Sequence, residues 1–454
     1  MVFFGCLFAL AMAAAILIPY LTGKADLLTS WNLFLLGSLN FVGCGAVVAG
    51  QSTFRLGWYD DDDRLKFVLG AIVCYAALFA SYYTLRLPRR LAGRSLSKWP
   101  PIWGPTLVVL IAFCLLLTIG GLYLPSVQGV TQIMAIAGRV APVLILAYLF
   151  MIWMERPSHP VLLALLAASV ILALAVAMSG DITRRNLLSI VMTIAICLYW
   201  LRLRYSRPRW SLTVIGVLGL VAMLATAGWT AIRFQLRGPT TLAGKLEGVV
   251  TSGAGSGSRL LDLFSGDAAA ECGCIAIHHY THEAAPQPFF TIKFVLSNPV
   301  PRAFWPDKPK ALGETLPHDL GVWKKGYVNW GPCIIGHGFH EGGAVGGYFM
   351  LMFYGVLFGG IMRFFDQLLR RQPNNPFLIA TLGATSAQII AFSRGDIGYF
   401  CIAIIGVSMS GLLVPLFIRL FSGTGFRYPK AGEELPADSA PQSAGLAQGQ
   451  YEYA

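Results

Sequence analysis

Titratable residues gather in a glycine-rich stretch from Gly331 to Gly343. It holds His337, His340 and Glu341 within five positions, directly before an apolar run that begins near 344. A His or Glu at the mouth of an apolar helix is partly withdrawn from water and can act as a general base. The alternative is an ordinary glycine-rich start of a helix with solvated polar groups. We favour a catalytic role because three titratable residues converge.

Cations stand in a second stretch, from Asn298 to Lys310, which contains four prolines, three cations and two aromatic residues. Proline fixes φ and removes backbone donors, so the stretch should be stiff and extended and should hold Arg302 and Lys308 in place. A guanidinium fork plus an ammonium suits a diphosphate. A rigid surface loop with solvated cations is an equally weighted alternative.

Further cations are expected on the same side of the chain. Arg394 and Asp396 stand in a very short hairpin between two apolar runs, Arg184 precedes another run, and Arg233 follows one. Ionisable residues at membrane depth are costly and suggest function, although an Arg–Asp pair that caps two helices would also satisfy them. We therefore count Arg394, Arg184 and Arg233 as candidate diphosphate ligands.

Two tryptophans near these cations, Trp305 and Trp330, are candidates for stacking on sugar rings. Aromatic residues also anchor helices at membrane interfaces, and this is their commoner role. Their residue type therefore fits either a glycan site or an interface.

A metal site is weighed for one cluster of potential ligands: Cys272, Cys274, His278, His279, His282 and Glu283. The Cys-x-Cys and His-x-x-x-His spacings resemble zinc ligands. However, Gly and Ala dominate the neighbourhood, and in an oxidising compartment Cys333 is available for pairing. We therefore favour a disulfide or a solvated loop and expect no metal. The acidic run from Asp60 to Asp63 is interpreted as a solvated helix start that the helix dipole favours.

The elements that position these residues follow from composition. Of 454 residues, 56% are apolar and only 12% are charged, and mean hydropathy is +0.63. An ordinary soluble domain has about 25% charged residues, so this class is excluded. The net charge of +12 does not indicate nucleic acid, because no basic soluble segment with interleaved aromatic residues exists. The sequence predicts an all-α polytopic membrane protein.

Eleven apolar runs are long enough to cross a bilayer. They lie near residues 3–21, 31–49, 67–85, 105–124, 132–153, 160–178, 187–201, 211–231, 344–362, 376–392 and 398–418. This predicts about eleven transmembrane helices: eight within 1–231, a large outer (periplasmic) loop over 232–343, three within 344–421, and a disordered cytoplasmic tail over 422–454.

Orientation follows from the short loops, because Lys and Arg are retained on the cytoplasmic side. One side carries 17 basic residues, including those at 86–98, 202–209 and 363–371, whereas the other carries six. The basic side should face the cytoplasm. The segment 232–343 then lies outside, and the odd number of spans places the N-terminus outside as well.

This arrangement resembles the Wzy-type O-antigen and oligosaccharide repeat-unit polymerases of bacterial envelopes. The likeness rests on the many-helix bundle with one large late loop, on the Pro-Arg-x-x-Trp-Pro-x-Lys-Pro stretch from Pro301 to Pro309, and on the glycine-rich segment 331–343. In that family an acidic residue commonly follows the glycine of the second motif. Here Gly336 is followed by His337, with Glu341 four residues later.

The resemblance implies a GT-C-like glycosyltransferase of the bacterial inner membrane that polymerises undecaprenyl-diphosphate-linked oligosaccharides into O-antigen, lipopolysaccharide or exopolysaccharide, without a metal cofactor. Its partners would be the lipid-linked glycan, the membrane and a chain-length regulator protein. Glu341, His337 or His340 would serve as the base. An O-antigen ligase, which differs in its acceptor, stays open. A glycan transporter also stays open, although no internal repeat supports it.

Overall fold

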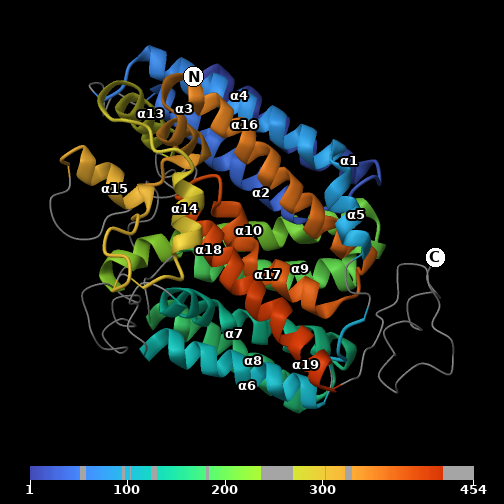
Figure 1. The fold of residues 1–454 in the computed structure, drawn as a ribbon. Helices are drawn as coiled ribbons and strands as arrows, with labels where there is room; N and C mark the ends of the chain where they lie inside the picture. Colours follow the sequence, from blue (N-terminus) through green and yellow to red (C-terminus); the bar gives the residue numbers. More distant parts are fainter. Residues whose placement is uncertain are drawn as a thin grey trace.

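The computed structural model describes residues 1–51, 58–94, 98–102, 104–123, 130–179, 184–236, 269–301, 303–322 and 330–422. Within these ranges the chain is helical and has no strand. The helices, labelled as in Figure 1, are α1 (Val2–Leu21), α2 (Ser30–Ser38), η1 (Leu39–Cys44), α3 (Gly45–Gln51), α4 (Asp61–Thr84), α5 (Arg86–Arg94), α6 (Pro105–Tyr123), α7 (Val130–Glu155), α8 (Pro160–Ser179), α9 (Arg184–Leu201), η2 (Leu203–Tyr205), α10 (Pro208–Leu236), α13 (Ala269–His278), η4 (His279–Glu283), α14 (Phe290–Ser297), α15 (Leu312–Asp319), α16 (Cys333–Arg371), α17 (Pro376–Ala391), α18 (Ile397–Ser408), η5 (Met409–Leu413) and α19 (Val414–Ser422).

Each of the eleven expected spans coincides with a helix or a continuous helical run. Within the described ranges, nine are long and apolar enough to cross a membrane. Two shorter apolar helices, Arg185–Leu201 and Pro376–Ala391, account for the other two expected spans. The second and last spans are composite, because the π-helical turns η1 and η5 join their α-helical parts. The chain is an all-α polytopic membrane protein, as its composition predicts.

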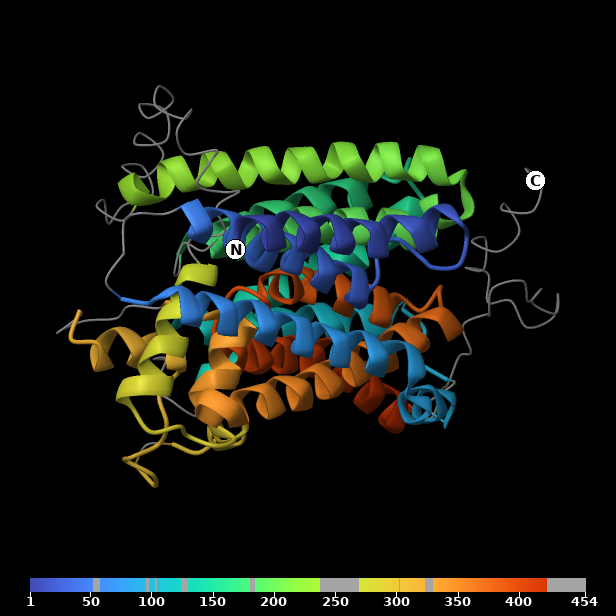
Figure 2. The same cartoon turned by 90° about the horizontal axis from the view of Figure 1, so that it is seen from above.

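The helical bundle has two chemically different ends. At one end, which we call the basic end, Arg204 forms an ion pair with Asp26 at 2.7 Å, and Arg371 donates a hydrogen bond to the carbonyl of Arg89. This end therefore gathers three of the basic segments that the sequence assigns to one side. Figures 1 and 2 both show α5 at this end and α13, α14 and α15 at the opposite end.

The opposite end, here called the α13–α15 end, also receives the N-terminus. A Cβ on Gly50, at the end of α3, would meet Val2 of α1, and a Cβ on Gly45 would meet Ala270 of α13. The start of α1 therefore lies beside the segment that follows residue 269 (Figure 1). The eight expected spans between the N-terminus and this segment are an even number, which requires both to lie at the same end.

The segment 232–343 differs from a simple loop. Helix α10 extends to Leu236, and α13, η4, α14 and α15 are helical. The apolar stretch Phe290–Ser297 forms α14, whose Phe294 packs against α18. Thr251–Ser258, Arg302 and the tail from residue 423 lie outside the described residues.

Helix α16 begins at Cys333 rather than near 344, so residues 333–342 are helical and not a glycine-rich loop. At Gly343 the backbone is non-helical, with φ 63° and ψ −156°, a conformation that glycine adopts readily. The two arms of α16 fold back on each other, because a Cβ on Gly338 would meet Leu351 and one on Gly347 would meet Phe339. These glycines allow the two arms to pack closely. The sequence pattern alone does not distinguish such a packed helical hairpin from a flexible glycine-rich loop.

Cysteine labelling tests the orientation of the two ends. Phe304 in the segment before α15 is 83% exposed, and Leu87 in α5 is 63% exposed. In a background with exposed Cys6 replaced by Ser, Phe304→Cys should react with an impermeant thiol reagent in intact bacterial spheroplasts. Leu87→Cys should react only after lysis, because basic loops are retained in the cytoplasm. The reverse pattern would overturn the assignment.

Candidate functional site

The carboxylate of Glu341 is the centre of the candidate site. It lies in the short first arm of α16, and its side chain is fully buried. Oε1 accepts a hydrogen bond from the backbone N–H of Thr291 in α14 at 3.0 Å, and Oε2 accepts one from the hydroxyl of Tyr354 at 2.6 Å. Tyr354 lies in the second arm of α16, so the reversal at Gly343 brings it to Glu341.

The imidazole of His337 is linked to this carboxylate through Thr291. The side chain is 1% exposed, and Nε2 accepts a hydrogen bond from the N–H of Ile397 at 3.3 Å. A neutral ring therefore carries its proton on Nδ1, which lies 3.1 Å from the hydroxyl of Thr291. Because one residue of α14 contacts both groups, any shift of α14 changes the surroundings of His337 and Glu341 together.

His340 faces a different, aromatic neighbourhood. Its ring centroid lies 4.4 Å from that of Tyr280 and 4.6 Å from that of Phe290, both at steep interplanar angles. Its Nδ1 is buried without a hydrogen-bond partner in the described residues. All three sequence-predicted titratable residues thus lie in one buried region where α14, η4 and the first arm of α16 meet.

The predicted diphosphate ligands have different placements. Lys308 is 3% exposed, and its ammonium donates to the carbonyls of Asn298 at 2.6 Å and Val300 at 3.2 Å, which closes the loop after α14. Arg394 is half-buried, with its guanidinium 5.9 Å from the ring centre of Phe41. Arg302 lies outside the described residues, so its role as a ligand stays a prediction.

Arg185, rather than its neighbour Arg184, is the residue of α9 with a described placement near Arg394. Its guanidinium lies 4.9 Å from the ring centre of Phe400 and 3.4 Å from the side-chain oxygen of Gln388. The backbones of Arg184 and Arg233 are helical, but their side chains lie outside the described residues. The roles of Arg184 and Arg233 as diphosphate ligands stay predictions.

Asp396 caps α18. Its Oδ1 accepts from the N–H of Tyr399 at 3.1 Å, and its Oδ2 accepts from the N–H of Gly313 at 2.9 Å. Burial raises the pKa of this carboxyl, and the backbone N–H groups that it accepts from act in the opposite direction. The carboxylate therefore ties α15 to α18.

The tryptophans lie at the same end of the bundle. Trp305 is 43% exposed, on the loop before α15. Trp330 is half-buried, and its ring centre lies 6.1 Å from that of Trp58. Its backbone N–H donates to the carbonyl of Gly313 at 2.8 Å. Trp305 has the greater ring surface available for a sugar.

A second group of polar side chains joins Asp63 to the histidines that the sequence brings into consideration as metal ligands. Asp63 is fully buried rather than solvated, and its Oδ2 lies 2.7 Å from Nδ1 of His278. Asp63 forms a reciprocal capping box with Asp60, which confirms the expected helix start. The Asp-x-x-Asp spacing before an apolar helix was the available signal for the cap, whereas nothing in the sequence pairs residues 63 and 278.

Two acidic groups at the rim of this second group carry lowered pKa values. The backbone N–H of Asp63 lowers the pKa of Asp60, and the side chain of His279, 2.7 Å away, lowers the pKa of Glu283. Both carboxylates thus favour the charged form.

Of the two alternatives to a metal site that the sequence leaves open, the disulfide is not formed among the described residues. Cys274 and Cys333 are free thiols buried in the core, and a Cβ on Gly273 would lie 2.9 Å from Sγ of Cys333. Cys272 is also buried. These residues act as small packing groups between α13 and α16, because the close approach of the two helices leaves room only for small side chains.

Comparison with known proteins identifies no relative: no family model, no curated protein and no solved structure matches the chain.

Proposed function

We propose that this chain is a membrane glycosyltransferase. It joins undecaprenyl-diphosphate-linked oligosaccharide repeat units into a surface polysaccharide at the outer face of the bacterial inner membrane. The observation that supports this most is the meeting of Glu341 and His337 on Thr291, within a membrane bundle. Ionisable groups inside a membrane protein are costly and by default indicate function.

The proposed reaction is a displacement at the reducing-end carbon of the donor glycan. A hydroxyl oxygen of the acceptor forms the new glycosidic bond to that carbon. The bond from the carbon to the diphosphate oxygen breaks, and lipid diphosphate leaves with the bonding electron pair. The hydroxyl proton passes to the base, which we assign to Glu341. Because Thr291 and Tyr354 hold both carboxylate oxygens, α14 has to shift before an acceptor reaches Glu341.

In this proposal, cations at the α13–α15 end stabilise the negative charge of the leaving diphosphate. Charge develops on the diphosphate in the transition state, and preorganised cations stabilise such charge. Arg394 lies half-buried near this region, and Arg185 lies on the neighbouring helix start. Trp305, with its exposed ring, is the proposed surface for the glycan.

The function is tested with the purified full chain in vesicles loaded with lipid-linked repeat units. Polymerase activity predicts a ladder of lipid-linked glycans that grow by whole repeats, together with release of lipid diphosphate. Movement of intact repeat units across the vesicle membrane without elongation would instead indicate a transporter. A single transfer to a lipid A acceptor without a ladder would indicate a ligase.

The Arg302→Lys variant tests the diphosphate ligand. A planar guanidinium binds two phosphate oxygens at once, whereas an ammonium with the same charge does not reproduce that geometry. We expect the variant to lose most chain growth in the vesicle assay while it inserts normally. Lys310→Arg, a conservative change in the same stretch, is the matched control and should retain activity. Normal growth by Arg302→Lys would show that the residue acts as a point charge or a structural group.

A further inference from the structure

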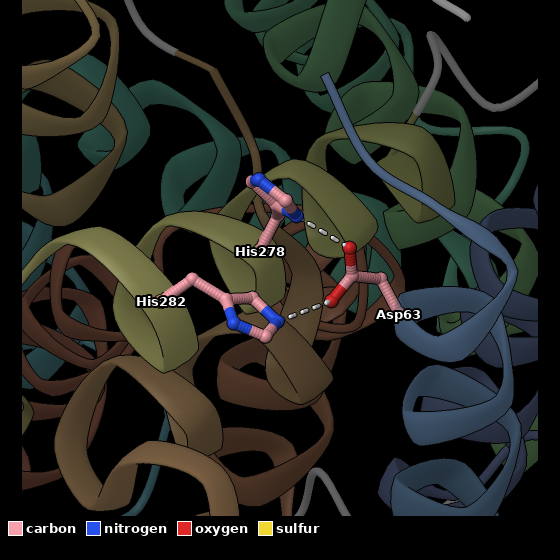
Figure 3. Close-up of side chains that lie close together, drawn as sticks. All are labelled: Asp63, His278 and His282. Atoms are coloured by element: carbon pink, nitrogen blue, oxygen red, sulfur yellow. Dashed lines mark hydrogen bonds and ion pairs between the residues drawn. The ribbon is translucent and has the colours of Figure 1, made fainter. Parts of the chain in front are cut away.

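The side chains of Asp63, His278 and His282 form a cluster (Figure 3). His278 Nδ1 lies 2.7 Å from Asp63 Oδ2, and His282 Nε2 lies 3.9 Å from Asp63 Oδ1. One ligand atom from each residue lies within 4.8 Å of the other two. We propose that these three residues bind a divalent transition-metal ion of the Zn²⁺ type.

One oxygen of the Asp63 carboxylate accepts no hydrogen bond within the described residues, and the Lys66 ammonium lies 3.7 Å from it. Its side chain is fully buried, and Oδ2 is engaged by the N–H of Asp60 at 3.1 Å and by His278. Oδ1 is also buried but accepts no hydrogen bond within the described residues, and it faces His282. A buried oxygen without a donor is costly, and coordination to a cation would remove that cost.

The spacing of the ligand atoms suits coordination. Zn²⁺ binds imidazole nitrogen and carboxylate oxygen at about 2.0–2.2 Å, so two ligand atoms of a tetrahedral site are about 3.4 Å apart. Nδ1 of His278 lies 2.7 Å from Oδ2 of Asp63, and Nε2 of His282 lies 3.9 Å from Oδ1, the other oxygen of the same carboxylate. One ligand atom from each residue lies within 4.8 Å of the other two, so an ion would have to draw the three side chains closer together. Two imidazoles and one carboxylate favour zinc-like ions over Mg²⁺ or Ca²⁺, which prefer oxygen ligands.

The backbone holds the three ligands from two directions. Asp63 is fixed at the start of α4 by its capping box with Asp60. His278 ends α13, and His282 lies in the π-helical turn η4. The ring centres of these two histidines lie 5.1 Å apart. Such π-helical turns are frequent at functional sites. Oε1 of Glu283 lies 4.0 Å from Nε2 of His278, the ring nitrogen that does not contact Asp63, so Glu283 can orient that imidazole.

The positive charge of Lys66 opposes metal binding at this cluster. Its ammonium lies 3.4 Å from Nε2 of His282 and 3.7 Å from Oδ1 of Asp63, and it also forms an ion pair with Asp62 at 2.7 Å. The ammonium therefore competes with a metal ion for the same carboxylate. Because Asp62 is 60% exposed, Lys66 can keep that ion pair while it moves away from Asp63. Removal of the Lys66 charge should strengthen metal binding.

A bound ion would join α4 to the α13–η4 segment. These two parts are 215 residues apart in the chain. Metal binding to the folded protein alone adds stability by mass action, so the thermal midpoint should rise with metal concentration. A bound ion would therefore hold the α13–η4 segment, which leads into α14, against the start of α4.

Binding is measured with the full chain purified in detergent without a histidine tag and treated with chelator. Titration calorimetry with ZnCl₂ should show one Zn²⁺ per chain, and Co²⁺ should give tetrahedral absorption bands. His282→Gln should weaken Zn²⁺ binding by at least about tenfold, since even loss of a group that supports a ligand has an effect of that size. His159→Gln, at an exposed histidine before α8, is the matched control and should bind like the parent.

Two further measurements complete the test. Zn²⁺ should raise the unfolding midpoint of the parent protein but not that of His282→Gln, and Lys66→Gln should bind Zn²⁺ several-fold more tightly. No stoichiometric binding by the parent, or equal binding by His282→Gln, would overturn the proposal. Unchanged or weaker binding by Lys66→Gln would refute the position of the ion beside Asp63. None of these readouts depends on glycan transfer, so they stand apart from the proposed enzymatic function.

Discussion

Replacement of Glu341 by Gln is expected to reduce glycan chain growth by about 10²- to 10⁴-fold, the usual effect of losing a general base. The substitution should leave the fold intact. The amide oxygen still accepts from the N–H of Thr291, and the hydroxyl of Tyr354, which can donate or accept, pairs with the amide NH₂. The vesicle assay measures elongation, and a pull-down with lipid-linked donor measures retained binding.

Two matched variants separate catalysis from structure at this site. Tyr354→Phe removes one hydrogen bond to Glu341 but keeps the carboxylate, so it should retain much more activity than Glu341→Gln. His337→Ala tests the alternative base. Near-normal elongation by Glu341→Gln, with loss of elongation in His337→Ala, would assign the base to His337. Equal losses of activity and of thermal stability in Glu341→Gln and Tyr354→Phe would indicate a structural role.

Replacement of Asp366 by Ala should cause a large loss of stability. This buried carboxylate of α16 accepts from the backbone N–H and the hydroxyl of Ser30, each at 2.8 Å, from the N–H of Trp31 at 3.2 Å and from the hydroxyl of Tyr82 at 2.9 Å. A buried donor left without a partner costs about 1–3 kcal/mol, so loss of this acceptor should cost at least about 3 kcal/mol. Denaturant unfolding in detergent measures the change.

The control for Asp366 is Ser30→Ala, which removes one of the four donors and leaves the acceptor in place. Its expected cost is about 1 kcal/mol, the usual net value of one hydrogen bond. Both variants lie far from the α13–α15 end, so the residual folded fraction should retain its specific activity. A stability of Asp366→Ala equal to that of the parent would contradict the role of this residue as the joint between α2, α4 and α16.

The sequence alone predicted the positions of the apolar helices. Hydropathy is a local sum over about 20 residues; in the described part of the chain nine of the eleven runs form helices that satisfy it, and the other two form shorter apolar helices. The uneven distribution of Lys and Arg likewise predicted two unlike ends. The sequence also indicated that His337, His340 and Glu341 belong to one region, because they are neighbours along the chain.

The tertiary structure alone decided which of these residues meet which partners. Glu341 contacts Tyr354 because α16 reverses direction at Gly343. The sequence does not predict this reversal, because a glycine-rich segment before a helix is compatible both with a flexible loop and with a tight helical hairpin. Asp63 meets His278 across 215 positions. Such contacts depend on how helices pack, since their energy arises between segments and leaves no periodic trace in either one.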